Sequence, residues 1–244
     1  MHSAIFERLR RGLEQNELFA LATVVAGPGV GNQILVWPGG QFLGDLGAPR
    51  LNQRASIYAE QAIPEFGSAR KSFRQDGDAV DVFFEVFAPP PKLILVGAVH
   101  VAISLIAFAK LLGFRSVVID PRTAFATAER FADADRLILE WPAEALEDEG
   151  INENTYLAVL SHDLKIDLPA LEVALRSRAR YIGALGSKKT HAKRVAALKE
   201  AGFGDEELGR IHSPIGLPLG GRHAEEIALA IIAQVVAARY GLDA

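Results

Sequence analysis

The sequence predicts an α/β fold in which a doubly wound parallel sheet follows a smaller α+β domain. Two observations carry this prediction. Strand-like and helix-like segments alternate along the C-terminal part, and several of its strand-like segments are apolar throughout, as parallel strands buried on both faces are. The prolines of 89–91 hold an extended linker in front of this part. We therefore expect an N-terminal domain over residues 1–88 and a C-terminal domain over 92–244.

The composition is that of a globular protein. The chain has 244 residues, of which 50% are hydrophobic and 23% are charged, enough for two modest cores. A net charge of −4 leaves no basic excess for a phosphate backbone, so we expect no nucleic-acid partner. Cysteine is absent, which excludes disulfides, thiolate metal sites and cysteine nucleophiles within the chain. Neither a signal peptide nor a membrane span is visible, so we expect a cytoplasmic protein with no membrane partner.

The N-terminal part opens with an amphipathic segment. Ile5, Leu9 and Leu13 recur at helical spacing, with charged residues between them. Further along, short apolar runs bounded by turn residues predict strands, and one longer segment predicts a helix that ends before Pro64. The predicted strands are 18–25, 33–37, 41–43 and 80–87, and the predicted helix is 50–62.

The C-terminal part alternates between the two kinds of element, which indicates a Rossmann-like sheet covered by helices on both faces. A glycine follows three of the four predicted helices, as C-terminal caps commonly do. The predicted strands are 93–96, 116–119, 136–139, 155–160 and 181–182, and the predicted helices are 101–112, 168–178, 188–201 and 225–240.

The junction after the first of these strands partly fits the G-x-G-x-x-G/A fingerprint of dinucleotide sites. Gly97 and Ala102 occupy its first and third key positions, with Ala98 and His100 between them. The middle glycine of the fingerprint lets the backbone approach a pyrophosphate, and Val99 replaces it here. We expect the loss of φ > 0 freedom to add strain at this position. Ordinary dinucleotide binding and an altered or lost dinucleotide site both remain open. In either case the helix N-terminus favours an anion.

Two charged residues follow the next strand. Asp120 ends that strand, where an acidic residue can accept hydrogen bonds from ribose hydroxyls. Arg122 either contacts a phosphate, including a ribose 2′-phosphate, or simply opens a surface loop.

A polar triplet, Ser161, His162 and Asp163, follows the strand at 155–160. Loops at the carboxyl ends of parallel strands line the ligand crevice of such sheets, so these side chains are candidates for ligand binding. His162 and Asp163 are also candidates for proton transfer. The alternative is local turn capping by Ser161 and Asp163.

A third junction carries Gly186, Ser187 and Lys188 before a predicted helix. Backbone donors, a hydroxyl and a cation together can hold an anionic ligand. The spacing is not that of a Walker A loop, and the alternative is an N-cap at Ser187 beside solvated lysines. The six histidines form no pattern of metal ligands, so we predict no metal site.

Four segments, in this order, resemble the XdhC/CoxI family, the accessory factors of xanthine dehydrogenase and related molybdenum hydroxylases. They are GAVHVAISLIAFAKLLGFRSVVIDPR, SHD, YIGALGSKKTHAKR and SPIGLPLGGRHAEEIALAIIAQVVAAR. The resemblance implies a Rossmann-like domain that binds molybdenum cofactor, as molybdopterin or its dinucleotide form, as a transient ligand. It also implies transfer of that cofactor to a molybdenum hydroxylase apoenzyme, often after its terminal sulfur ligand is installed.

The sequence departs from the family pattern at two places. The glycine loop of the family usually reads GAGH, whereas Val99 stands here at the second glycine. The N-terminal domain of the family usually carries a glycine–cysteine motif, and the corresponding region here is Gly44-Asp45-Leu46-Gly47. A thiol in that domain therefore cannot handle the cofactor in this chain.

Three functions follow as hypotheses. The leading one is a maturation factor that binds molybdenum cofactor, rather than a turnover enzyme. The second is an NAD(P)-dependent oxidoreductase in which Asp120 holds the ribose and His162 or Asp163 donates the proton. The third is a non-catalytic adaptor in which the first and last helices form a homodimer seam. The first hypothesis requires a pocket for a small anion, walled by the junctions near residues 97, 162 and 187.

Overall fold

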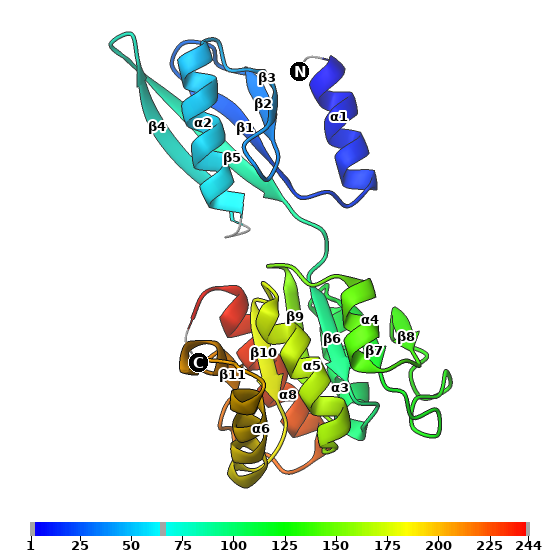
Figure 1. Ribbon diagram of the computed structural model, residues 1–244. Coiled ribbons are helices and arrows are strands. Elements are labelled where there is room, and N and C mark those ends of the chain that lie inside the picture. Colours follow the sequence, from blue (N-terminus) through cyan, green and yellow to red (C-terminus); the bar gives the residue numbers. More distant parts are fainter. Residues whose placement is uncertain (1–2, 64–66, 243–244) are drawn as a thin grey trace. The chain divides into compact units, whose positions relative to one another are not determined.

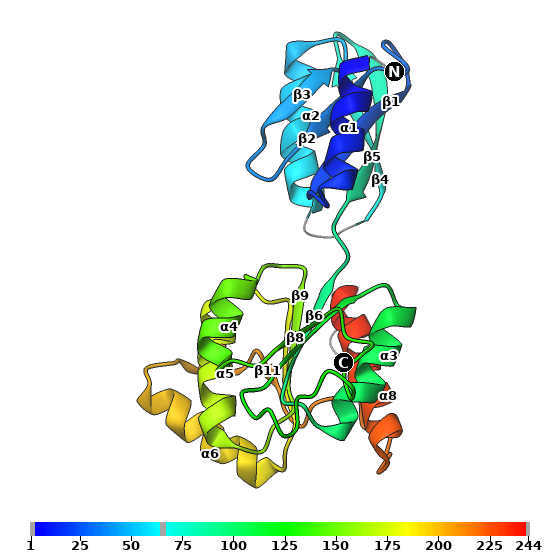
Figure 2. The same cartoon turned by 90° about the vertical axis from the view of Figure 1, so that its right-hand side faces the viewer.

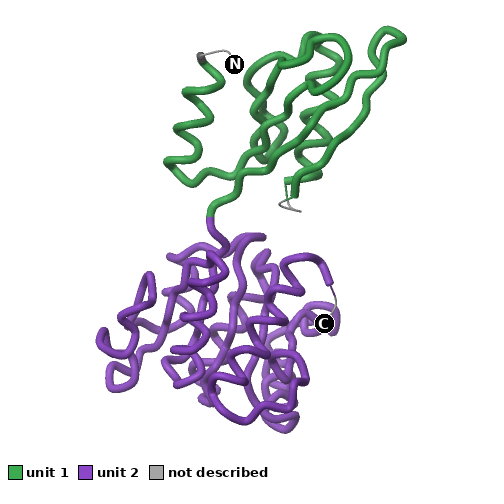
Figure 3. The backbone as a smooth tube through the Cα atoms, turned by 180° about the vertical axis from the view of Figure 1, so that it is seen from behind, with its two compact units in different colours: residues 1–89 green, residues 90–244 purple. Residues whose placement is uncertain are grey.

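A computed structural model describes residues 3–63 and 67–242 of the chain. It divides into two compact units, Met1–Pro89 and Pro90–Ala244 (Figure 3). The boundary lies between the first two residues of the proline run.

The first unit is a five-stranded antiparallel sheet with one helix on each face (Figures 1 and 2). The strand order is β3-β2-β1-β5-β4. The strands are β1 (Phe19–Ala26), β2 (Gln33–Val36), β3 (Phe42–Asp45), β4 (Ala69–Gln75) and β5 (Asp78–Phe87), and the helices are α1 (Ser3–Glu14) and α2 (Pro49–Ala62).

Strand β1 shows how this sheet sorts its side chains. Phe19 and Leu21 face α1 and cluster with Ile5, whereas Ala20 and Ala22 face α2. Because successive strand residues point to opposite faces, one apolar strand supplies two separate cores. Only some of the apolar residues of α1 pack into the core, since Phe6 and Leu13 each stay 49% exposed.

The second unit holds a six-stranded sheet in which every strand pair is parallel. Its strand order is β11-β10-β9-β6-β7-β8. When β6 to β11 are numbered 1 to 6 and read from the β8 edge, this is the order 3-2-1-4-5-6 of a doubly wound fold. The predicted Rossmann-like fold class is thereby confirmed. The strands are β6 (Lys92–Val96), β7 (Arg115–Ile119), β8 (Arg136–Ile138), β9 (Thr155–Val159), β10 (Tyr181–Ala184) and β11 (Ile211–His212).

Helices cover both faces of this sheet (Figure 2). Leu93 and Leu95 of β6 pack on the side of α3 and α8, and Ile94 and Val96 pack on the opposite side with α4, α5 and α6. The double burial explains why the strands read as continuous apolar runs. The helices are α3 (His100–Leu111), α4 (Pro142–Glu149), α5 (Leu164–Arg176), α6 (Lys188–Glu200), α7 (Asp205–Leu208) and α8 (Ala224–Arg239).

Several elements differ from the expectations. The structure adds β4, α4, α7 and β11, and it starts α5 at Leu164, four residues before the predicted 168. Asp163 caps that helix by accepting a hydrogen bond from the Lys165 backbone N–H. The helix predicted over 50–62 is α2, which ends at Ala62, before Pro64, as expected.

None of the helices among the described residues combines the length and the hydropathy needed to cross a bilayer. The cytoplasmic location and the homodimer remain predictions from the sequence.

Candidate functional site

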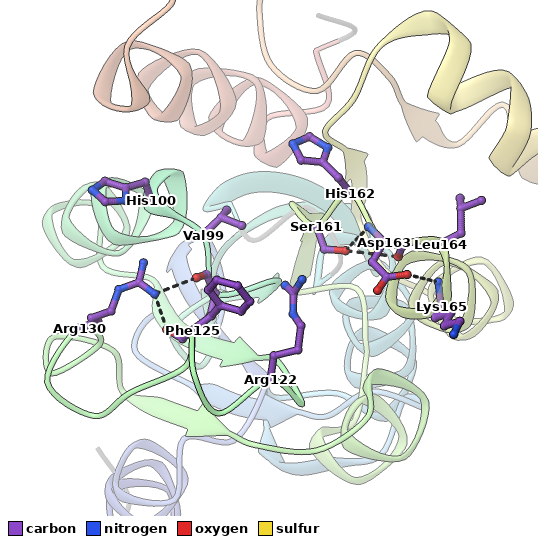
Figure 4. Close-up of a pocket in the computed structure, with 11 residues that line it drawn as sticks. Val99, His100, Arg122, Phe125, Arg130, Ser161, His162, Asp163, Leu164 and Lys165 are labelled. Carbon is purple, nitrogen blue, oxygen red and sulfur yellow. Dashed lines mark hydrogen bonds between the residues drawn. The ribbon is translucent and has the colours of Figure 1, made fainter.

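The carboxyl ends of β6, β7 and β9 meet at a pocket of about 880 Å³ (Figure 4). Its size is in the range of small-molecule and cofactor sites. Three loops supply its walls: the β6–α3 turn, the segment after β7, and the β9–α5 turn. The lining residues are Ala98, Val99, His100, Arg122, Phe125, Arg130, Ser161, His162, Asp163, Leu164 and Lys165.

Among the charged side chains of the lining, cations outnumber carboxylates. Arg122, Arg130 and Lys165 line the pocket against a single carboxylate, Asp163. That carboxylate already accepts the Lys165 backbone N–H at 3.0 Å as the cap of α5. The first turn of α3, which starts at His100, adds the positive end of a helix dipole. Charge therefore favours an anionic ligand.

Asp120 lies beneath this pocket, with no exposed surface. One of its carboxylate oxygens accepts the Ala98 backbone N–H at 2.7 Å. The same carboxylate accepts the Arg122 backbone N–H at 2.9 Å and both Nε and Nη2 of the Arg122 side chain, at 2.9 and 2.7 Å. Four donors thus occupy the acidic group that the fingerprint assigns to a ribose.

These contacts also set the ionisation of Asp120. Burial alone would raise the pKa of its carboxyl group, but the hydrogen bonds from the Arg122 side chain and from the backbone N–H groups of Ala98 and Arg122 outweigh burial and lower it. Asp120 is therefore an anion at neutral pH, and it fixes the Ala98 turn and the Arg122 guanidinium.

Phe125 and Arg130 also line the pocket, and the sequence did not indicate either of them. The Arg122 guanidinium lies over the Phe125 ring, 4.9 Å from its centroid. The Nη1 atom of Arg130 donates to the backbone oxygens of Ala98 and Phe125, which holds it at the pocket (Figure 4). The segment that carries Phe125 and Arg130 is irregular, so no periodicity could have indicated their position.

The glycine loop has a packing role at its first position. Gly97 has φ of +112°, and a Cβ there would lie 2.8 Å from the Ser161 backbone nitrogen. Val99 does not require a glycine, because its φ is −96° and its ψ is 170°. The expected strain at Val99 is therefore wrong, since any residue adopts this extended conformation. The Val99 side chain instead forms part of the pocket wall.

The polar triplet splits into different roles. Asp163 caps α5, and Ser161 is fully buried, where its hydroxyl donates to Asp167 Oδ1 at 2.7 Å and accepts the Asp163 N–H at 3.1 Å. The local capping alternative thus describes the contacts of Ser161 and Asp163. His162 is exposed and lines the pocket, as does His100 at the start of α3.

A buried ion pair that the sequence did not indicate lies behind the triplet. Arg194 of α6 and Asp167 of α5 both have fully buried side chains, and Arg194 Nε donates to Asp167 Oδ2 at 3.0 Å. Arg194 Nη2 also donates to the backbone oxygens of Leu185 and Ser161, at 2.8 and 3.3 Å. Burial raises the pKa of Asp167, against the hydrogen bonds from Ser161 and Arg194. This pair ties the β9 and β10 loops together.

The third junction lies at the carboxyl end of β10 but outside the lining of this pocket. Ser187 is the N-cap of α6, and its hydroxyl accepts the Thr190 N–H at 3.2 Å. Gly186 has φ of +152° and lies against Arg194, and Lys188 begins the helix. The structure therefore brings two of the three expected walls together, without residues 186–188. An anion contact at Gly186, Ser187 and Lys188 remains a prediction.

The loop at the place of the family's glycine–cysteine motif is closed by its own side chains. Asp45 Oδ1 accepts the Gly47 N–H and the Asn52 side-chain amide, each at 2.9 Å. Asn52 in turn accepts the Leu46 N–H at 2.7 Å. These hydrogen bonds, that of Asn52 foremost and then that of Gly47, lower the pKa of Asp45. Over the described residues, no group of three or more potential metal ligands gathers.

Comparison with known proteins gives a consistent result. The family model described as the XdhC Rossmann domain matches residues 93–235. A crystal structure described as a xanthine dehydrogenase from Bacillus halodurans superposes with a TM-score of 0.70 at 24% identity, over 95% of this chain and 65% of that one. At this identity the superposition shows a shared fold.

Three curated relatives are similar in sequence. An uncharacterized protein of Escherichia coli K12, YqeB, is 27% identical over 95% of this chain and 46% of its own length. A protein of Bacillus subtilis 168 named as a probable xanthine dehydrogenase subunit is 30% identical over 65% of this chain and 46% of its own length. The molybdenum cofactor insertion chaperone PaoD of E. coli K12 is 31% identical over 64% of this chain and 43% of its own length. The chain thus spans less than half the length of these relatives.

Proposed function

The chain belongs to the XdhC family, and from that premise we propose that it binds molybdenum cofactor and assists the maturation of a molybdenum hydroxylase of the xanthine dehydrogenase type. The name of PaoD supports the cofactor, and the name of the B. subtilis relative supports the kind of target enzyme. The chain acts in this proposal as a carrier, and the cofactor is its cargo.

The observation that carries the proposal is the cationic pocket at the carboxyl edge of the sheet. Molybdopterin is a flat heterocycle that ends in a phosphate, and its dinucleotide form carries a pyrophosphate. Arg122, Arg130 and Lys165 supply the charge for such groups, and the Phe125 ring supplies a flat apolar surface. At about 880 Å³ the pocket accommodates a ligand of this size.

The composition bears on how the cargo is held. The chain contains no cysteine, so it supplies no thiolate to molybdenum or to the dithiolene sulfurs. We infer that it binds the phosphate and ring portion of the cofactor and leaves the molybdenum end for the acceptor enzyme. His100 and His162, both exposed at the pocket, are the side chains available for a proton or hydrogen bond at that end.

The geometry argues against the NAD(P)-dependent alternative. A ribose would have to displace Arg122 from Asp120, which already accepts four hydrogen bonds.

The test has two stages. Purified chain is titrated with molybdopterin, followed by its fluorescence, and the loaded chain is then mixed with a cofactor-free molybdenum hydroxylase. We expect saturable binding and faster recovery of hydroxylase activity than with free cofactor. The Arg178→Gln variant, altered at an arginine with 82% side-chain exposure, is expected to match the wild type. Absence of cofactor binding by both proteins would refute the carrier role.

A further inference from the structure

A second pocket, of about 660 Å³, lies within the N-terminal unit between α2 and β4. It is lined by the start of α2, from Ala48 to Arg54, and by the end of β4 with the turn after it. No residue of this pocket takes part in the function proposed above.

Three arginines line this pocket. Arg50 and Arg54 come from α2 and Arg74 from β4, opposed by one carboxylate, Asp76. Across residues 3–63 and 67–242, none of these arginines forms an ion pair. A local excess of positive charge is therefore gathered in one cavity of a chain whose net charge is −4.

One of the arginines is already held in place. Arg54 Nη1 donates to the backbone oxygen of Arg74 at 3.0 Å, and its guanidinium lies 5.3 Å from the centroid of the buried Phe73 ring. These contacts fix Arg54 between the helix and the strand. Binding a ligand there costs less side-chain entropy than ordering a free arginine would.

The N-terminus of α2 adds positive electrostatic potential at the same pocket. The 14-residue α2 begins at Pro49, and its N-cap residue, Ala48, has no side chain that could accept a backbone hydrogen bond. Pro49 has no N–H, so the N–H groups of Arg50 and Leu51 are the first donors of the helix, and both residues line the pocket. Three arginines and the first turn of α2 thus line one cavity.

We propose that this pocket is a second anion site, which takes the phosphate or diphosphate group of a small organic molecule. Guanidinium forks match phosphate oxygens in pairs, and a helix start is suited to the same group. The site is separate from the pocket at the carboxyl edge of the Rossmann-like sheet and does not depend on the role proposed for that pocket.

The test is calorimetric titration of the full chain with inorganic pyrophosphate at low salt. The Arg50→Gln/Arg74→Gln variant removes two guanidiniums but keeps the Arg54 contacts. The Arg10→Gln/Arg70→Gln control makes the same change of charge on exposed side chains of the same unit. A third variant, Arg122→Gln/Arg130→Gln, removes the other cationic pocket.

We expect the wild type to bind pyrophosphate, the Arg50→Gln/Arg74→Gln variant to lose one site or to bind there about tenfold or more weakly, and the control to be unchanged. The Arg122→Gln/Arg130→Gln variant should retain the N-terminal site. The proposal is overturned if the Arg50→Gln/Arg74→Gln variant binds as the wild type does, or if Arg122→Gln/Arg130→Gln abolishes all binding. The last outcome would leave the carrier proposal intact, so the two proposals fail separately.

Discussion

Two aspartate–arginine pairs lie near the same edge of the Rossmann-like sheet, and they do different work. Asp120 pairs with Arg122, two residues along, and the Arg122 side chain remains 32% exposed at the pocket. Asp167 pairs with Arg194, 27 residues along, and neither side chain has exposed surface. The first pair presents a cation to a ligand, whereas the second joins two loops in the interior.

The contrast shows that an arginine's role depends on what surrounds its free donors. Arg122 uses Nε and Nη2 on Asp120 and extends beside Phe125 into the pocket. Arg194 is fully buried and uses Nε and Nη2 on Asp167 and on two backbone oxygens, so these contacts position loops in the interior. Variants that break one pair or the other therefore test this contrast.

Breaking the buried pair should cost the most stability. Arg194→Met leaves the Asp167 charge buried without its partner, and such losses destabilise by about 3–5 kcal/mol. Urea unfolding followed by circular dichroism measures this effect. The matched control is Arg194→Met/Asp167→Leu, in which no charge remains buried, and it should recover a large part of the loss. A double variant as unstable as Arg194→Met would contradict the electrostatic explanation.

Removing the acid of the exposed pair should cost less. Asp120→Ala leaves the buried Ala98 N–H without its acceptor and frees Arg122, for which we expect a loss of about 2–3 kcal/mol. The same urea experiment measures it. If Asp120→Ala proves more destabilising than Arg194→Met, the assignment of structural and ligand-facing pairs is reversed.

Lowering the pH should remove the stabilisation that the Asp120 carboxylate gives. Its pKa is lowered in the folded state, so its contribution to stability is full above the ordinary carboxyl pKa and is lost as pH falls through the folded value. We expect the free energy of unfolding of the wild type to fall more steeply below about pH 4 than that of Asp120→Asn. Parallel pH profiles for the two proteins would show that the carboxylate gives no such stabilisation.

The smallest effect is expected at Val99. Val99→Gly restores the middle glycine of the dinucleotide fingerprint, yet Asp120 stays occupied by Arg122. We therefore expect no thermal shift with NAD(H) or NADP(H), for the wild type or for the variant. A dinucleotide at ~100 times its dissociation constant would stabilise by about 2.7 kcal/mol, which such a titration detects. A clear shift in the variant would show that Val99 alone blocks the site.

The fold was predictable where burial leaves a pattern in the sequence. Strands such as β6 and β9 read as apolar runs because both faces are covered. Strand β4 left no such pattern, since among its residues only Phe73 is buried at the sheet edge. Strand β11 has two residues, too few for any periodicity.

The site was predictable in position but not in contacts. Gly97, Asp120 and Ser161 follow strands of a parallel sheet, so topology alone brings them to one edge. That Asp120 is saturated by Arg122 depends on the conformation of a short loop, which the sequence pattern does not encode. Arg194 sits in a segment rich in lysine, where hydropathy predicts exposure rather than a side chain with 0% exposure.

The central claim is that the pocket between the β6, β7 and β9 loops holds the phosphate-bearing end of the cofactor. The most direct measurement compares the dissociation constants of molybdopterin for the wild type, Arg122→Gln/Arg130→Gln and the exposed control Arg178→Gln. We predict binding about tenfold or more weaker in the pocket variant, with the control unchanged. Equal dissociation constants for all three proteins would contradict the claim.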